Sequence, residues 1–110
     1  MIDGFSSVAN ACFYNNITIT HVHIGNTVTD IVNHAFSPCP NLTSVSFESG
    51  SQLTNIHNKA FYNSGLSGSI TLPALLTKID YRAFNTCPSL DTVYIDPLNT
   101  TLISIGNNTF

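Results

Sequence analysis

Residues 42–61 read LTSVSFESGSQLTNIHNKAF, and this order of apolar positions decides the fold. The stretch holds two patterns, LxxVxF and LxxIxxxAF, joined by a short polar loop. The same order recurs along the chain, and each copy ends on a phenylalanine: Phe13, Phe36, Phe61, Phe84 and Phe110. The intervals of 23, 25, 23 and 26 residues fall in the range that stacked repeat units show. The chain is therefore predicted to be a repeat array.

The first pattern of each unit alternates apolar and polar residues and is rich in β-branched side chains. Its inward pairs are Val22 and Ile24, Val45 and Phe47, Ile70 and Leu72, and Val93 and Ile95. A period of two predicts a strand in each unit. Because the strand returns after one full circuit of the chain, the strands are expected to run parallel in one sheet. The second pattern closes the opposite wall. An asparagine stands two positions before the residue that precedes the phenylalanine in four of the five units, with Tyr81 in the other. It predicts a capped, short helical or 3₁₀ turn.

The pattern resembles the BspA-like leucine-rich repeats, whose consensus is of the type LxxVxIPxxVxxIGxxAFxxC. The similarity runs from about Phe5 to Phe110 and is closest in residues 42–61 and 66–87. The cysteine that ends the family motif is present at Cys39 and Cys87. The resemblance implies a right-handed leucine-rich repeat solenoid, mainly β with short 3₁₀ or helical turns. It would contain one parallel sheet and about four to five repeats of 23–26 residues. It also implies binding or adhesion at a cell surface, and no catalytic residue.

Composition narrows the partners and the compartment. The net charge is −3 and only three residues are basic, so no nucleic-acid partner is expected. No segment approaches the roughly 20 apolar residues of a membrane helix, and the first residues lack a signal-peptide pattern. Membrane insertion is therefore not expected. We predict one leucine-rich repeat domain over residues 1–110, part of a longer array. The family resemblance suggests the cell surface, while a cytoplasmic location stays open.

Candidate chemistry is sparse. His21 and His23 place two imidazoles on one face of a predicted strand, a pair that zinc or copper can use. The neighbouring strand adds only Ser44 and Ser46 at matching positions, so a third ligand is missing. No metal or other cofactor is therefore expected. The sequence also has no Gly-rich phosphate loop, no His-Glu zinc motif and no recognisable nucleophile with its base, which predicts that the chain is not an enzyme.

The loops after the predicted strands differ in length. They hold three residues in 25–27 and 73–75, five in 48–52 and six in 96–101. Such an edge of a solenoid often carries recognition, although neutral drift of loop length is the alternative. The outward strand positions add a hydroxyl-rich face. The predicted ligand-binding surface therefore combines the strand face and the post-strand loops: His21, His23, Ser44, Ser46, Glu48, Gln52, Thr71, Tyr94, Asp96 and Asn99.

Two hypotheses of function follow from these patterns. The first is a non-enzymatic protein-interaction or adhesion module, which binds a protein or a cell-surface ligand through the strand face and the post-strand loops. The second is a structural segment that stacks end to end into a homo-oligomer. It rests on the unpaired unit that each end of a repeat stack presents.

Overall fold

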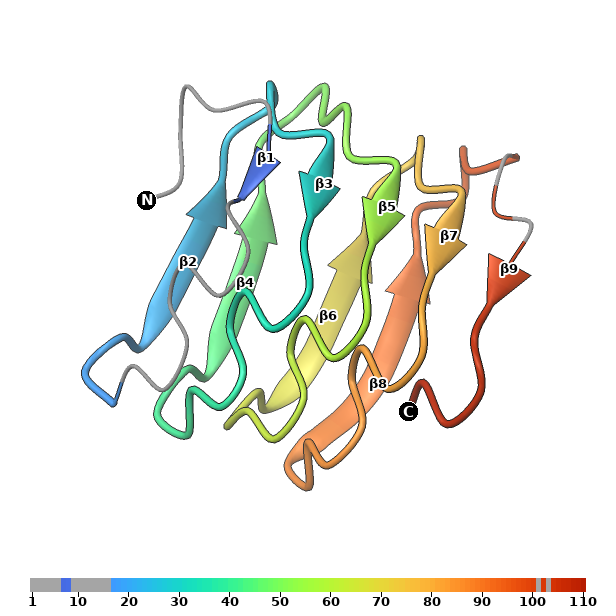
Figure 1. The fold of residues 1–110 in the computed structure, drawn as a ribbon. Coiled ribbons are helices and arrows are strands. Elements are labelled where there is room, and N and C mark those ends of the chain that lie inside the picture. The colour runs from blue at the N-terminus through green and yellow to red at the C-terminus, as the bar shows by residue number, and fades with distance from the viewer. Residues whose placement is uncertain (1–6, 9–16, 101, 103) are drawn as a thin grey trace.

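The computed structural model describes residues 7–8, 17–100, 102 and 104–110. The chain winds in successive circuits that stack side by side, each with one long and one short strand (Figure 1). The long strands are β2 (His21–Ile24), β4 (Ser44–Phe47), β6 (Gly68–Leu72) and β8 (Leu90–Ile95). The short strands are β1 (Ser7–Val8), β3 (Asp30–Ile31), β5 (Asn55–Ile56), β7 (Lys78–Ile79) and β9 (Ser104–Ile105).

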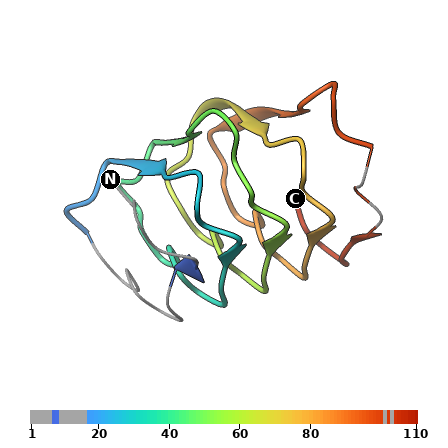
Figure 2. The ribbon, with the colours of Figure 1, turned by 90° about the horizontal axis from the view of Figure 1, so that it is seen from above.

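The strands form two opposite walls, which the view from above separates (Figure 2). All pairings are parallel, which confirms the predicted solenoid. The short strands build a ladder in the order β1-β3-β5-β7-β9, a second sheet beyond the one that the sequence predicted. Each short strand has only two residues, too few to show an alternation of apolar and polar side chains, so the sequence did not predict this sheet. Threonine side chains reinforce this ladder, because Thr54 Oγ1 donates to the Thr29 carbonyl (3.2 Å) and Thr77 Oγ1 to the Thr54 carbonyl (2.9 Å).

The repeated phenylalanines stack face to face inside the solenoid. Ring centroids lie 5.2 Å apart for Phe36 and Phe61, 5.2 Å for Phe61 and Phe84, and 5.7 Å for Phe84 and Phe110. Phe13 lies outside the described residues. Backbone hydrogen bonds connect the same units. The N–H groups of Phe36, Phe61 and Phe84 each donate, over 2.8 Å, to the carbonyl of the residue just before the next phenylalanine in the stack. The phenylalanine turns are thus hydrogen-bonded from unit to unit.

These turns differ from the predicted helical turns, since the described residues contain no helix. The residue two positions before each of Phe36, Phe61, Phe84 and Phe110 has a positive φ: 58° at His34, 55° at Lys59, 55° at Arg82 and 54° at Asn108. A left-handed residue interrupts a right-handed helical turn. The N–H groups of His34, Lys59 and Arg82 donate instead to carbonyls of the following unit, over 2.9–3.3 Å.

No helix able to span a membrane occurs in the described part of the chain.

The core fills the space between the two walls. Its members are the apolar positions of the repeat, buried as the sequence predicts. They include Val22, Ile24, Val28, Ile31, Ala35, Phe36, Leu42, Leu53, Ile56, Ala60, Phe61, Leu66, Ile70, Leu72, Leu76, Ile79, Ala83 and Phe84. Val45, Phe47, Val93 and Ile95 are only partly buried, which marks the two places where the stack is open.

Candidate binding surface

Serine and histidine side chains pair across the outer face of β2 and β4. His21 Nδ1 contacts Ser44 Oγ, and His23 Nδ1 lies 2.8 Å from Ser46 Oγ. The register places these residues directly opposite each other, His21 with Ser44 and His23 with Ser46. The part of the predicted strand face on β2 and β4 is thus polar. Within the described residues, no group of three or more His, Cys, Asp or Glu side chains is arranged to hold a metal ion.

The post-strand loops are held by the side chains of several predicted site residues. Glu48 Oε1 accepts a 2.7 Å bond from the Asn26 N–H, and Asp96 Oδ1 accepts a 2.8 Å bond from the Leu98 N–H. Asn99 donates to the Leu76 carbonyl at 3.0 Å and accepts from the Leu102 N–H at 2.9 Å. Asn99 therefore links its loop to the neighbouring unit.

The wall of long strands is split between β4 and β6. Strand β2 pairs with β4 and β6 pairs with β8, but β4 and β6 belong to different sheets. Figure 1 shows β4 and β6 further apart than either pair. A groove of about 710 Å³ opens there, lined by residues 45–51 and 69–75 together with Asp96 and Leu98. Val45 and Phe47 line it, so the groove reaches the apolar core in the middle of the stack.

The groove gathers only part of the predicted surface. Ser46, Glu48, Thr71 and Asp96 line it. The other predicted residues lie on the adjoining strand face or loops and do not line it: His21, His23, Ser44, Gln52, Tyr94 and Asn99. Its apolar members Leu75 and Leu98 were absent from the prediction, although both are exposed, at 47% and 79%. The sequence signal that could have identified these two residues was their position in the post-strand loops of adjacent units.

Two glycines explain the split. Gly65 lies so close to the preceding unit that a Cβ would stand 2.1 Å from the Pro40 carbonyl oxygen. The Ser67 N–H still donates to the Thr43 carbonyl of that unit at 3.1 Å. Gly68 has φ +69°, and its N–H donates instead to the Ser89 carbonyl of the following unit at 3.1 Å. The two units therefore touch where β6 begins and diverge beyond Gly68.

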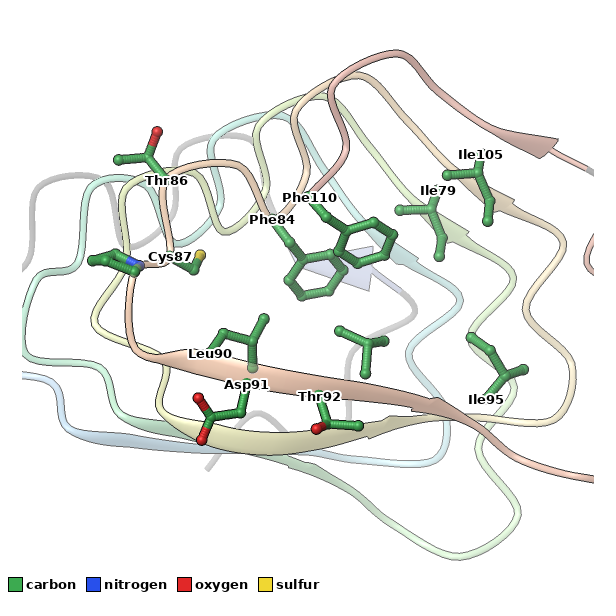
Figure 3. A pocket seen from close by; sticks show the side chains of 12 residues that line it. Ile79, Phe84, Thr86, Cys87, Leu90, Asp91, Thr92, Ile95, Ile105 and Phe110 are labelled. Atoms are coloured by element: carbon green, nitrogen blue, oxygen red, sulfur yellow. The ribbon is translucent and has the colours of Figure 1, made fainter.

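A second cavity, of about 590 Å³, lies beside β8 at the C-terminal end of the stack. Figure 3 shows Phe84 and Phe110 above the cavity, Ile79 and Ile105 at its short-strand side, and the residues of β8 below. Phe110 and Ile105 are 57% and 54% exposed. Asp91 is the one charged residue in the lining among the described residues. This cavity exposes the core at the end of the stack.

An acidic cluster around His57 lies on the short-strand wall. His57 Nε2 is 3.0 Å from Asp30 Oδ1, and His57 Nδ1 is 3.7 Å from Asp80 Oδ2. Asn55 Nδ2 donates to Asp30 Oδ1 at 3.0 Å, and Lys78 Nζ lies 3.3 Å from Asp80 Oδ1. The cluster joins three successive units, because its members come from the neighbourhoods of β3, β5 and β7. It serves to hold these units together.

Asp30 gives the stability a defined pH dependence. Burial alone would raise the pKa of this carboxyl, but hydrogen bonds from His57, Thr29 and Asn55 outweigh burial and hold the pKa below 3.8. Because the folded pKa is lower than the unfolded one, this contribution is present above about pH 4 and is lost as the pH falls through the folded pKa. Urea unfolding at a series of pH values measures the loss. Asp30→Asn should remove this part of the profile, and an unchanged profile in the variant would contradict the assignment.

Taken together, the stacked phenylalanines, the paired walls and the open groove define a parallel β-solenoid of leucine-rich units. The family described as "BspA type Leucine rich repeat region (6 copies)" matches residues 5–110, and the chain belongs to this family. No curated protein matches the sequence.

One solved structure with the same fold is the crystal structure of the pneumococcal vaccine antigen PcpA. The TM-score is 0.81 at 21% sequence identity, over 100% of this chain and 33% of that one. The chain thus spans about a third of the length of the antigen chain. At this level of identity, the likeness shows a common fold.

Proposed function

We propose that the chain is a non-enzymatic interaction module that binds a protein or a cell-surface ligand through the groove and the adjoining loops and strand face. The observation that carries the proposal is the split between β4 and β6. A regular solenoid buries its inward residues in the middle of the stack, yet Val45 and Phe47 are only partly buried here. Apolar surface left open between polar rims is typical of sites that bind other molecules.

The chemistry of the groove favours a segment with both apolar and basic side chains. Leu75 and Leu98 provide exposed apolar surface at the rim. Glu48 and Asp96 add two carboxylates, whose orientation is fixed by the backbone bonds that they accept. No Lys, Arg or His lines the groove in the described part of the chain. A partner segment with a large apolar residue beside Lys or Arg is complementary in both respects.

A non-enzymatic role agrees with the contacts of the strand face. Ser46 and His23 form a hydroxyl–imidazole pair at 2.8 Å, the first two parts of a catalytic triad. The third part, a group that orients the imidazole, has no counterpart at His23 among the contacts of the described residues. The ion pairs that involve histidine among the described residues belong to His57 on the other wall.

Selection from a phage-displayed library of random linear peptides tests the proposal. We expect the selected sequences to combine a basic residue with a neighbouring large apolar residue. A labelled selected peptide should bind Leu98→Ser roughly tenfold more weakly than the unaltered protein, measured by fluorescence anisotropy, because Leu98 loses its apolar contact. Ile17→Ser is the matched control, since Ile17 is 63% exposed and lies outside the groove.

Charge is tested by a second matched pair of variants. Asp96→Asn keeps an acceptor for the Leu98 N–H but removes the negative charge, so we expect weaker binding with a smaller salt dependence. Asp91→Asn changes the net charge equally in the same unit, outside the groove. Selected peptides that bind Leu98→Ser and Asp96→Asn as well as they bind the unaltered protein would exclude the groove as the binding surface.

A further inference from the structure

The split in the middle of the long-strand wall leaves an unpaired backbone edge on β4. Successive peptide groups along a strand point to alternate edges. The N–H groups of Ser44 and Glu48 donate to carbonyls of the preceding unit, over 3.4 and 2.9 Å. The N–H and C=O groups of Val45 and Phe47 therefore point the other way, toward the split. Within the described residues, no backbone hydrogen bond joins these two residues to β6.

Pro73 is one reason why the split stays open. In the two regular pairs, the residue that follows the later strand, Glu48 or Asp96, donates its N–H to the preceding unit over 2.9 Å. Pro73 holds the same place after β6, and proline has no N–H to donate. The next backbone bond between these two units joins the Thr77 N–H to the Thr54 carbonyl, at 2.8 Å on the short-strand wall.

The apolar surface that the split uncovers also belongs to β4. Val45 and Phe47 are only partly buried, whereas Ile70 and Leu72 of β6 are buried. The same two residues of β4 thus carry the uncovered side chains and the unpaired backbone. An extended segment is complementary to both, because its backbone can bond to a strand edge while its alternate side chains cover the core. A helix satisfies its backbone groups internally and would leave this edge unpaired.

We propose that the groove binds one extended segment of a partner polypeptide, which pairs through its backbone with the unpaired edge of β4. This inference rests on the proposed function, because it concerns the same groove. Hydrogen bonds to the backbone of Val45 and Phe47 supply affinity that does not depend on the partner's sequence. The carboxylates of Glu48 and Asp96, which line the groove, select among the possible segments.

The geometry of β4 sets the side-chain pattern of the segment. In a strand beside β4, every second side chain faces the core next to Val45 and Phe47, and the side chains between them face outward. Glu48 and Asp96 follow β4 and β8 in the outward phase of each strand. A segment with large apolar residues at positions i and i+2 and Lys or Arg at position i+1 therefore satisfies both the core and the carboxylates.

A peptide from the library selection described above serves as the probe, provided that it binds Leu98→Ser more weakly than the unaltered protein. Methylation of one peptide nitrogen at a time removes a donor and leaves every side chain in place. A strand bonded along one edge uses alternate peptide groups. Fluorescence anisotropy should therefore show roughly tenfold weaker binding for methylation at every second residue, and little change at the residues between them.

Hydrogen exchange of the isotope-labelled protein, followed by NMR, locates the pairing on β4. With the peptide bound, the amides of Val45 and Phe47 should exchange at least about tenfold more slowly, because they gain acceptors. The amides of Ser44 and Glu48 are the matched controls in the same segment. They already donate to the preceding unit, so their exchange should change much less.

Three outcomes would overturn the inference. A peptide that needs Leu98, tolerates methylation at every nitrogen and leaves the exchange of Val45 and Phe47 unchanged would exclude strand pairing but leave the proposed function intact. Selected peptides with apolar residues three and four positions apart, helical by circular dichroism when bound, would assign the groove to a helix. Peptides that bind Leu98→Ser and Asp96→Asn as well as the unaltered protein would contradict the proposed function itself, and this inference with it.

Discussion

Replacing Phe61 by alanine is expected to lower the free energy of unfolding by about 3 to 5 kcal/mol. The ring is fully buried and stacks on both sides, 5.2 Å from Phe36 and 5.2 Å from Phe84. Its removal leaves a cavity between the rings of Phe36 and Phe84. The backbone hydrogen bonds between units fix their spacing, so the stack cannot close the cavity. Both neighbouring rings also lose a stacking partner. Urea unfolding followed by circular dichroism measures the loss.

Phe110→Ala is the matched control for this prediction. Phe110 is 57% exposed and stacks on Phe84 alone among the described residues. Its replacement exposes little new surface and leaves no closed cavity, so the expected loss is about 1 kcal/mol. Equal losses at the two positions would contradict the different burial of the two rings.

Gly65→Ala is expected to destabilise the protein by about 3 kcal/mol. A Cβ at this position would lie 2.1 Å from the Pro40 carbonyl oxygen and 3.2 Å from the Leu42 carbonyl oxygen. Both are backbone atoms, so no side chain can move aside. The two units must separate where β6 begins, which also weakens the 3.1 Å bond between the Ser67 N–H and the Thr43 carbonyl. The thermal midpoint and the urea midpoint should both fall.

Gly68→Ala distinguishes a steric effect from a conformational one. A Cβ on Gly68 would meet nothing within 4 Å, but its φ of +69° disfavours alanine. The expected loss is about 1 to 2 kcal/mol, below that of Gly65→Ala. A larger loss at Gly68 than at Gly65 would mean that the contact of Gly65 with Pro40 does not hold the two units together.

The solenoid could be predicted from the sequence because its core repeats. Phe36, Phe61 and Phe84 recur in phase, and burial of each depends on neighbours of the same kind. The short-strand ladder was less visible, since two-residue strands leave no periodic pattern. The helical turns were predicted from asparagine preferences, whereas the positive φ of residues such as His34 is imposed by the hydrogen bonds between units.

The candidate surface could be predicted only in part, because it depends on departures from the repeat. Leu66 and Ile70 are four positions apart, whereas Leu42 and Val45 are three apart. This difference was visible in the sequence, but the opening it produces depends on the backbone at Gly68. The cluster around His57 was missed because it joins side chains from three units, and spacing along the chain does not reveal contacts across the stack.

The hydrogen bonds between the phenylalanine turns all run in the same direction. The N–H groups of Phe36, Phe61 and Phe84 each point toward the unit that follows. Peptide dipoles with a common direction add, as they do along a helix. The row of turns is therefore polarised along the stack, electropositive toward the following units and electronegative toward the preceding ones. In a chain with only 8% charged residues, this backbone polarity gives the turn row an electrical direction without any ionised side chain.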